Sequence, residues 1–205
     1  MKSSKLFLLF ELFCLFVGLP VLYLFDFAPG LWKGVPLLLL FLYCLITLHK
    51  ADAWKRSDWS LRTSGRSDWL KLLIFPVLLY SSLLIVSPDA IWADYSDKGV
   101  VIAIISYPLF SSLPQEIIYR KFFYLRYSGL VANPVILVAI NALLFSFAHI
   151  YFANYVALLL TFLGGIAFSI SYRKSKSLLF VSIEHSVYGL ALLCSSMNQY
   201  FYKAF

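Results

Sequence analysis

Glu116, Arg120, His149 and His185 are ionisable residues that lie within or at the edges of strongly apolar segments. Ionisable side chains are costly in such segments, so they usually face the interior of a helix bundle and mark a functional site. One glutamate and two histidines on three separate segments are enough to activate a water molecule or to bind a metal ion. The pattern therefore predicts a polar site that could activate water or hold a metal ion.

Glu116 and Arg120 are four residues apart, so on a helix they share one face and an ion pair is available to them. Taken alone, this pair is equally well explained as a clasp that holds one helix against another. Pro108 and Pro114 lie just upstream, and each removes a backbone donor and can kink the helix beside Gln115 and Glu116.

The two histidines differ in their surroundings. Asn141, Phe145 and His149 recur every four residues and should share a helix face. His185 lies in the middle of the segment VSIEHSVYG, and Tyr188 follows one turn later with a hydroxyl group. A single histidine near the end of a span is more often a hydrogen-bonded interfacial residue than a ligand, so the prediction depends on the whole set.

The elements that position these residues are predicted to be transmembrane helices. The 205 residues are 61% hydrophobic and 13% charged, which indicates an integral membrane protein. Continuous apolar runs such as Leu37–Ile46 argue against a β-barrel. We predict an all-α, polytopic membrane helix bundle of about seven or eight helices that forms a single domain over residues 1–205. The predicted spans are 6–25, 31–49, 70–88, 100–126, 132–151, 155–172 and 178–197.

The charged residues indicate the orientation of the chain in the membrane rather than a nucleic-acid partner. Basic residues gather in three alternate loops and at the N-terminus, whereas the loop at 87–99 is acidic, so the N-terminus should be cytoplasmic. The net charge of +7 is spread over these short loops, which argues against nucleic-acid binding. We expect a cell membrane (plasma or inner membrane) and contacts with the lipid bilayer. Glu11, alone in the first span, is expected to pair with a neighbouring helix.

Three ordered motifs resemble the CPBP intramembrane proteases, also called the Abi or type II CAAX prenyl endopeptidase family. The family pattern is Glu-Glu-x-x-x-Arg, Phe-x-x-x-His and His-x-x-x-Asn. It appears here as Gln115-Glu116-Ile-Ile-Tyr-Arg120, Phe145-Ser-Phe-Ala-His149 and His185-Ser-Val-Tyr-Gly189, within residues 100–195. The chain departs from the pattern at Gln115 and at Gly189.

The resemblance implies an intramembrane endopeptidase that cleaves a membrane-embedded or membrane-associated peptide or protein. By position, Glu116 would be the general base, His149 would help to position the attacking water, and Arg120 is retained. His185 would stabilise the oxyanion, with Tyr188 as a candidate hydroxyl donor. The enzyme would use either no cofactor or a zinc ion held by Glu116, His149 and His185, which makes it a glutamic or a metallo-endopeptidase.

Two other classes of function remain open from the sequence. Gln115 does not ionise near neutral pH and Gly189 has no side-chain donor, which fits a non-catalytic membrane protein for immunity or scaffolding. A transporter would be expected to show inverted repeats between the two halves, and none is evident.

Overall fold

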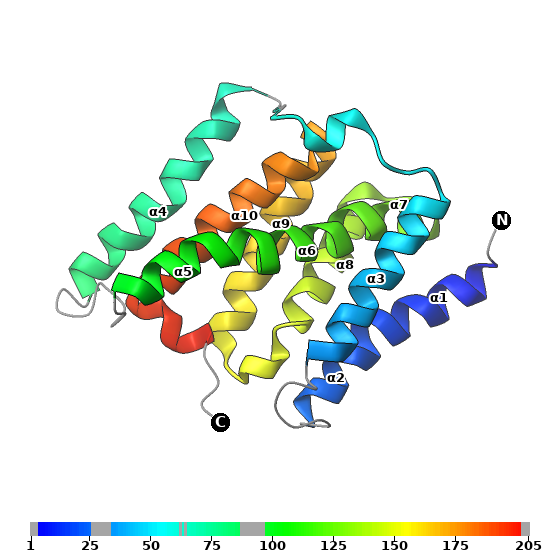
Figure 1. The fold of residues 1–205 in the computed structure, drawn as a ribbon, viewed down its shortest axis with the longest axis horizontal. Coiled ribbons are helices and arrows are strands. Elements are labelled where there is room, and N and C mark those ends of the chain that lie inside the picture. Colours follow the sequence, from blue (N-terminus) through cyan, green and yellow to red (C-terminus); the bar gives the residue numbers. More distant parts are fainter. Residues whose placement is uncertain (1–3, 26–33, 62, 64, 87–96, 202–205) are drawn as a thin grey trace. The chain divides into compact units, whose positions relative to one another are not determined.

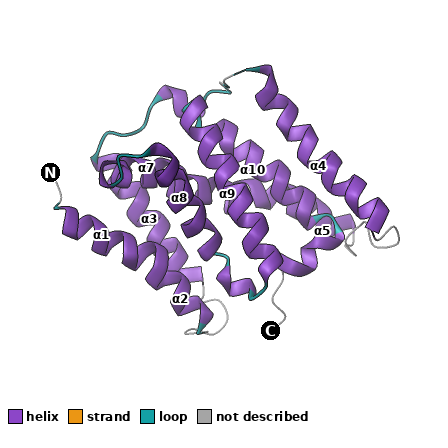
Figure 2. Ribbon diagram, turned by 180° about the vertical axis from the view of Figure 1, so that it is seen from behind, coloured by secondary structure: helices purple, strands orange, loops and turns teal. Residues whose placement is uncertain are grey.

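The structure is a computed structural model that describes residues 4–25, 34–61, 63, 65–86 and 97–201. Every element in these ranges is a helix or a loop, which confirms the all-α prediction (Figure 2). The chain divides into two compact units. Unit 1 consists of Met1–Lys55 and Ile117–Ser169, and unit 2 consists of Arg56–Glu116 and Ile170–Phe205. Each unit is described by itself.

Unit 1 contains the N-terminal helices and the helices that follow Glu116 in the chain (Figure 1). Its elements are α1 (Lys5–Phe13), the π-helical turn η1 (Cys14–Gly18), α2 (Leu19–Leu24), α3 (Gly34–Lys50), the π-helical η6 (Ile117–Phe122), α7 (Phe123–Tyr127), the 3₁₀ turn η7 (Ser128–Leu130), α8 (Pro134–Phe147), the 3₁₀ turn η8 (Ile150–Phe152) and the first part of α9 (Tyr155–Ser175).

Unit 2 contains the remaining helices, and α4 and α5 both pack on α10 (Figure 1). Its elements are η3 (Arg56–Trp59), α4 (Arg66–Val86), α5 (Asp97–Tyr107), the π-helical η5 (Pro108–Ser112), α6 (Leu113–Glu116), the last part of α9, α10 (Leu178–Leu193) and the 3₁₀ helix η9 (Ser196–Phe201). The loop predicted at 87–99 lies largely outside the described residues.

The predicted spans agree with the helices to within a few residues. In the described part of the chain, four helices are long and apolar enough to cross a membrane, and two shorter apolar helices accompany them. The long ones are Lys5–Leu24, Arg66–Val86, Pro134–Phe152 and Tyr155–Ser175, and the shorter ones are Val35–Lys50 and Leu178–Leu193. The predicted span 100–126 corresponds to the unbroken helical run from α5 to α7. The protein is therefore an integral membrane protein.

Close packing of α8 against α9 depends on a glycine. A Cβ atom at Gly165 would lie 2.9 Å from the Cα atom of Ala142, which is closer than Cβ atoms approach other carbon atoms. One turn further along α9, the hydroxyl of Ser169 donates to Oδ1 of Asn141 at 2.6 Å. The glycine thus lets a polar side chain of α9 reach a buried amide on α8.

Glu11 joins α1 to α7 and α3, which confirms the prediction that it pairs with a neighbouring helix. Its carboxylate accepts from Nε and Nη2 of Arg126 at 2.8 and 3.1 Å. The hydroxyls of Tyr127 and Tyr43 donate to the same carboxylate. A charge buried in an apolar surrounding is stable only when such partners satisfy it, so this cluster fixes the N-terminal helix within unit 1.

Candidate active site

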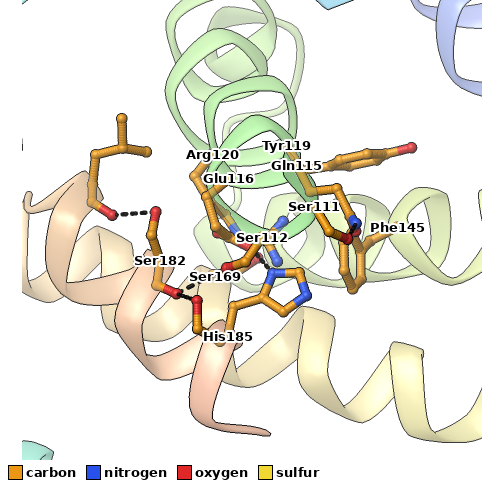
Figure 3. A network of polar contacts seen from close by, with 12 residues as sticks. Ser111, Ser112, Gln115, Glu116, Tyr119, Arg120, Phe145, Ser169, Ser182 and His185 are labelled. Carbon is orange, nitrogen blue, oxygen red and sulfur yellow. Dashed lines mark hydrogen bonds and ion pairs between the residues drawn. The ribbon is translucent and has the colours of Figure 1, made fainter. Parts of the chain in front are cut away.

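Glu116 and His185 form a buried hydrogen-bonded pair in unit 2. Nδ1 of His185 lies 2.8 Å from Oε1 of Glu116, and the side chain of Glu116 is fully buried (Figure 3). An ionised carboxylate only accepts hydrogen bonds, so Nδ1 carries the proton of this contact. The pair brings together two of the predicted site residues from α6 and α10.

One serine, Ser112, connects α10 to η5 beside this pair. The hydroxyl of Ser112, at the end of η5, donates to the backbone oxygen of Ser182 at 2.8 Å (Figure 3). The side chain of Ser182 in turn donates to the backbone oxygen of Leu178. Ser112 has no exposed surface, so this contact connects the two helices in an environment without competing water. It keeps the position of His185 constant relative to Glu116.

Tyr107 completes the surroundings of His185 and was not among the predicted site residues. Its hydroxyl oxygen lies 3.2 Å from Nε2 of His185, and the two rings meet edge to face. Both ring nitrogens of His185 therefore have a neighbour in unit 2: a carboxylate at Nδ1 and a phenol at Nε2.

Gln115 stands where the family pattern has its first glutamate. Its amide nitrogen donates to the hydroxyl of Ser111 at 2.9 Å, one turn earlier in the helix (Figure 3). Its Oε1 atom is buried without a hydrogen-bond partner among the described residues. The amide of Gln115 thus contacts a residue of its own helical segment, although Gln115 is adjacent to Glu116 in the chain.

Arg120 lies in unit 1, where a buried polar and aromatic environment holds its guanidinium group. Nη1 donates to Oδ1 of Asn141 at 2.9 Å, and the amide nitrogen of Asn141 donates to the backbone oxygen of Tyr119. The guanidinium carbon lies 5.0 Å from the ring centre of Phe145 and 5.7 Å from that of Phe168. Arg120 therefore fastens η6 to α8 and α9, in keeping with the structural role considered for it.

His149 lies just after α8, in unit 1, at the start of the turn η8. Its Nδ1 atom is 2.8 Å from the backbone oxygen of Phe145 and so carries a proton in the neutral ring. The same ring packs against Phe145 and Phe152. This arrangement leaves Nε2 as the nitrogen with a lone pair, which is the form that a base or a water-positioning group requires.

Tyr188 and Glu184 point to a different part of unit 2. The hydroxyl of Tyr188 donates to the backbone oxygen of Lys71 at 3.2 Å, and its ring lies on Phe75. The buried carboxylate of Glu184 faces the hydroxyls of Ser171 and Tyr188. The structure thus places Tyr107, rather than Tyr188, at the ring of His185, and the predicted role of Tyr188 as an oxyanion donor stays a prediction.

The predicted zinc ligands are divided between the two units, with His149 in unit 1 and Glu116 and His185 in unit 2. Within the described ranges, no three His, Cys, Asp or Glu side chains lie close enough to bind a metal ion. Glu116 and His185 are hydrogen-bonded to each other, and His149 belongs to unit 1. We therefore derive no step through a metal, a metalloendopeptidase is not supported, and zinc stays a prediction.

Residues 97–191 match the family described as "Type II CAAX prenyl endopeptidase Rce1-like". This range contains all three motifs, from Glu116 to His185. Through this segment, the chain is similar to the CAAX-protease-like family. Neither the curated proteins nor the solved structures that were searched include a match to the chain. The CAAX-protease-like segment overlaps residues 100–195, where the sequence showed the resemblance.

The matched family is described as an endopeptidase family. The segment includes Glu116, Arg120, His149 and His185, and it also includes Tyr107, which the motif pattern does not contain. In the sequence, Tyr107 is distinguished only by its place immediately before Pro108. Because it lies nine positions before Glu116, the sequence gave no reason to place the two residues in one site.

Proposed function

We propose that this protein is an intramembrane endopeptidase that hydrolyses a peptide bond of a membrane-embedded or membrane-associated substrate. The observation that carries the proposal is the buried hydrogen bond between Glu116 and His185 within the CAAX-protease-like segment. A carboxylate oriented by a histidine in a water-poor surrounding is suited to proton abstraction from a bound water.

In the proposed reaction, Glu116 removes a proton from a water molecule while the water oxygen bonds to the carbonyl carbon of the substrate. The carbonyl oxygen becomes an oxyanion, and the C–N bond breaks as the proton passes from Glu116 to the leaving nitrogen. The products are a carboxylic acid and an amine, so the atoms balance with water as the only co-reactant. His185 keeps Glu116 oriented through its Nδ1–H group.

The other predicted residues keep, in the proposal, roles that the resemblance implies or that their own contacts indicate. His149 would position the attacking water through Nε2, since its Nδ1 proton is engaged by a backbone oxygen. Arg120 is a positioning residue, because its guanidinium group binds Asn141 and two aromatic rings. We also propose that the N-terminus is cytoplasmic and that the protein lies in the cell membrane, as the basic loops predict.

The proposal is tested by cleavage of a membrane-anchored peptide reporter by the purified protein in liposomes. The native protein should cleave the reporter, and Glu116→Gln should reduce the rate by roughly 10²–10⁴-fold, as expected for loss of a general base. His185→Gln and His149→Gln should also reduce it. Reporters with and without a prenyl group reveal whether the substrate class includes prenylated peptides.

Glu184→Gln is the matched control for Glu116→Gln. Glu184 is also a fully buried glutamate of unit 2, but it faces Ser171 and Tyr188 instead of His185. We expect Glu184→Gln to retain the cleavage rate of the native protein. Equal cleavage by the native protein and Glu116→Gln would refute the assignment, and no cleavage by either across the reporters would favour a non-catalytic protein.

A further inference from the structure

Gly189 on α10 leaves space that the ring of Tyr107 occupies. A Cβ atom built at Gly189 would lie 2.1 Å from the hydroxyl oxygen of Tyr107, 2.4 Å from Cζ and 2.5 Å from Cε1. All three distances are far below van der Waals contact, and they involve the rigid end of an aromatic ring. Any other residue at position 189 would therefore displace Tyr107.

The space matters because it allows the Tyr107 hydroxyl to reach His185. The hydroxyl oxygen lies 3.2 Å from Nε2 of His185, while Nδ1 of the same ring lies 2.8 Å from Glu116. When Nδ1–H donates to the carboxylate, Nε2 of the neutral ring has a lone pair and accepts from the phenol. Proton donation then runs in one direction, from Tyr107 to His185 to Glu116.

A phenol is well suited to this position. It is a donor that stays protonated around neutral pH, and the edge-to-face contact of the two rings keeps its hydroxyl at the nitrogen. The hydroxyl of Ser111, one turn further along the helix, also faces the Tyr107 phenol.

We propose that Tyr107 is a positioning residue that holds His185 in the tautomer with its proton on Nδ1, and that Gly189 is required because it makes room for Tyr107. The inference deepens the proposed protease function and rests on it for its catalytic meaning. Position 189 is where the family pattern has asparagine, so in this chain the polar neighbour of His185 comes from another helix.

The tautomer is tested by nitrogen NMR of the full-length protein labelled with ¹⁵N in its histidine rings. A His185→Gln spectrum identifies the signals of His185 among those of the other histidines. The native protein should show a ring protonated at Nδ1 with an unprotonated Nε2, and Tyr107→Phe should shift the ring towards a mixture of both tautomers. An unchanged spectrum in Tyr107→Phe would overturn the proposal.

The role of Gly189 is tested by a double-mutant cycle on thermal stability in detergent. Gly189→Ala should lower the melting temperature in the native background and have a much smaller effect in Tyr107→Ala, where the ring is absent. Additive effects of the two substitutions would show that the glycine does not serve Tyr107. Neither this measurement nor the NMR spectrum requires proteolysis.

Cleavage rates connect the inference to catalysis. Tyr107→Phe should lower kcat about tenfold, the scale of one lost hydrogen bond to a charged network, with KM little changed. A native rate in Tyr107→Phe would overturn the catalytic meaning of the contact. If the native protein itself cleaves nothing, the proposed function fails, and the NMR spectrum and the double-mutant cycle still decide the structural inference.

Discussion

His185 donates a hydrogen bond from Nδ1 to Oε1 of Glu116 across 2.8 Å, joining residues that are 69 positions apart in the chain. The contact connects the first and third motifs of the family within unit 2. Both side chains are buried, so the geometry of the bond is set by the packing of α6 and α10 rather than by solvent. The proposed reaction depends on this geometry. Removal of a single methylene group from the side chain of Glu116 would change the geometry.

Glu116→Asp should abolish most activity although the carboxylate is retained. Shortening the side chain by one carbon withdraws the carboxylate by about 1.5 Å and breaks its hydrogen bond to His185. A displacement of this size costs on the order of 100-fold in rate. The measurement is the initial rate of reporter cleavage, and a rate for Glu116→Asp close to that of the native protein would show that His185 does not orient the base.

Gln115→Ala should have only a small effect on cleavage. The Gln115 amide bonds to Ser111 of its own helix and has no ionisable group, so a reaction that depends on Glu116 alone should lose less than about tenfold. Rates of Gln115→Ala and Glu116→Gln, measured side by side, check this. A loss as large as that of Glu116→Gln would mean that the amide takes part in the chemistry.

The lysine of the Arg120→Lys variant should not fulfil the role of Arg120. A lysine keeps the charge but loses the planar group that donates to Asn141 and lies near the rings of Phe145 and Phe168. We expect both a lower melting temperature and a lower cleavage rate. The exposed Lys174→Arg is the control and should change neither quantity. Native stability in Arg120→Lys would argue that charge alone is needed at this position.

Gly165→Ala should destabilise unit 1, because the new Cβ would lie 2.9 Å from the Cα atom of Ala142. Overpacking of this kind costs typically about 1–3 kcal/mol. Gly129→Ala is the matched control, since a Cβ there meets nothing within 4 Å. Unfolding in detergent measures the difference, and equal stability of the two variants would contradict the close packing of α8 and α9.

Glu11→Gln should destabilise the protein by roughly 3 kcal/mol, since it leaves the partly buried Arg126 without its counter-charge. The double variant Glu11→Gln/Arg126→Gln should recover part of the loss, because neither charge is then unpaired. Melting temperatures of the two single variants and the double variant check this. Strictly additive losses would show that the ion pair does not couple α1 to α7.

The helices, their approximate limits and the pairing of Glu11 could be predicted from the sequence, because long apolar runs and isolated charges constrain a membrane protein strongly. Tyr107 could not. At about 100° per residue, nine positions from Tyr107 to Glu116 place them on opposite faces of a regular α-helix. The π-helical segment Pro108–Ser112 changes the register between them, and both reach His185.

The same limit applies to Arg120. Its spacing from Glu116 made an ion pair available, but that spacing did not indicate that its guanidinium group donates to Asn141. Arg120 and Asn141 are 21 residues apart, so their contact depends on the packing of η6 against α8. Spacing within one helix reveals which side chains share a face, but not which neighbouring helix that face meets.

The bond between Glu11 and Arg126 limits how the family segment can be handled. Arg126 and Tyr127 lie inside residues 97–191, but the carboxylate that they share lies on α1, far outside that range. A fragment trimmed to the family match would leave Arg126 without its counter-charge. The segment 97–191 should therefore not be transferred alone into another protein. Chimaeras with relatives should exchange α1 and α7 together.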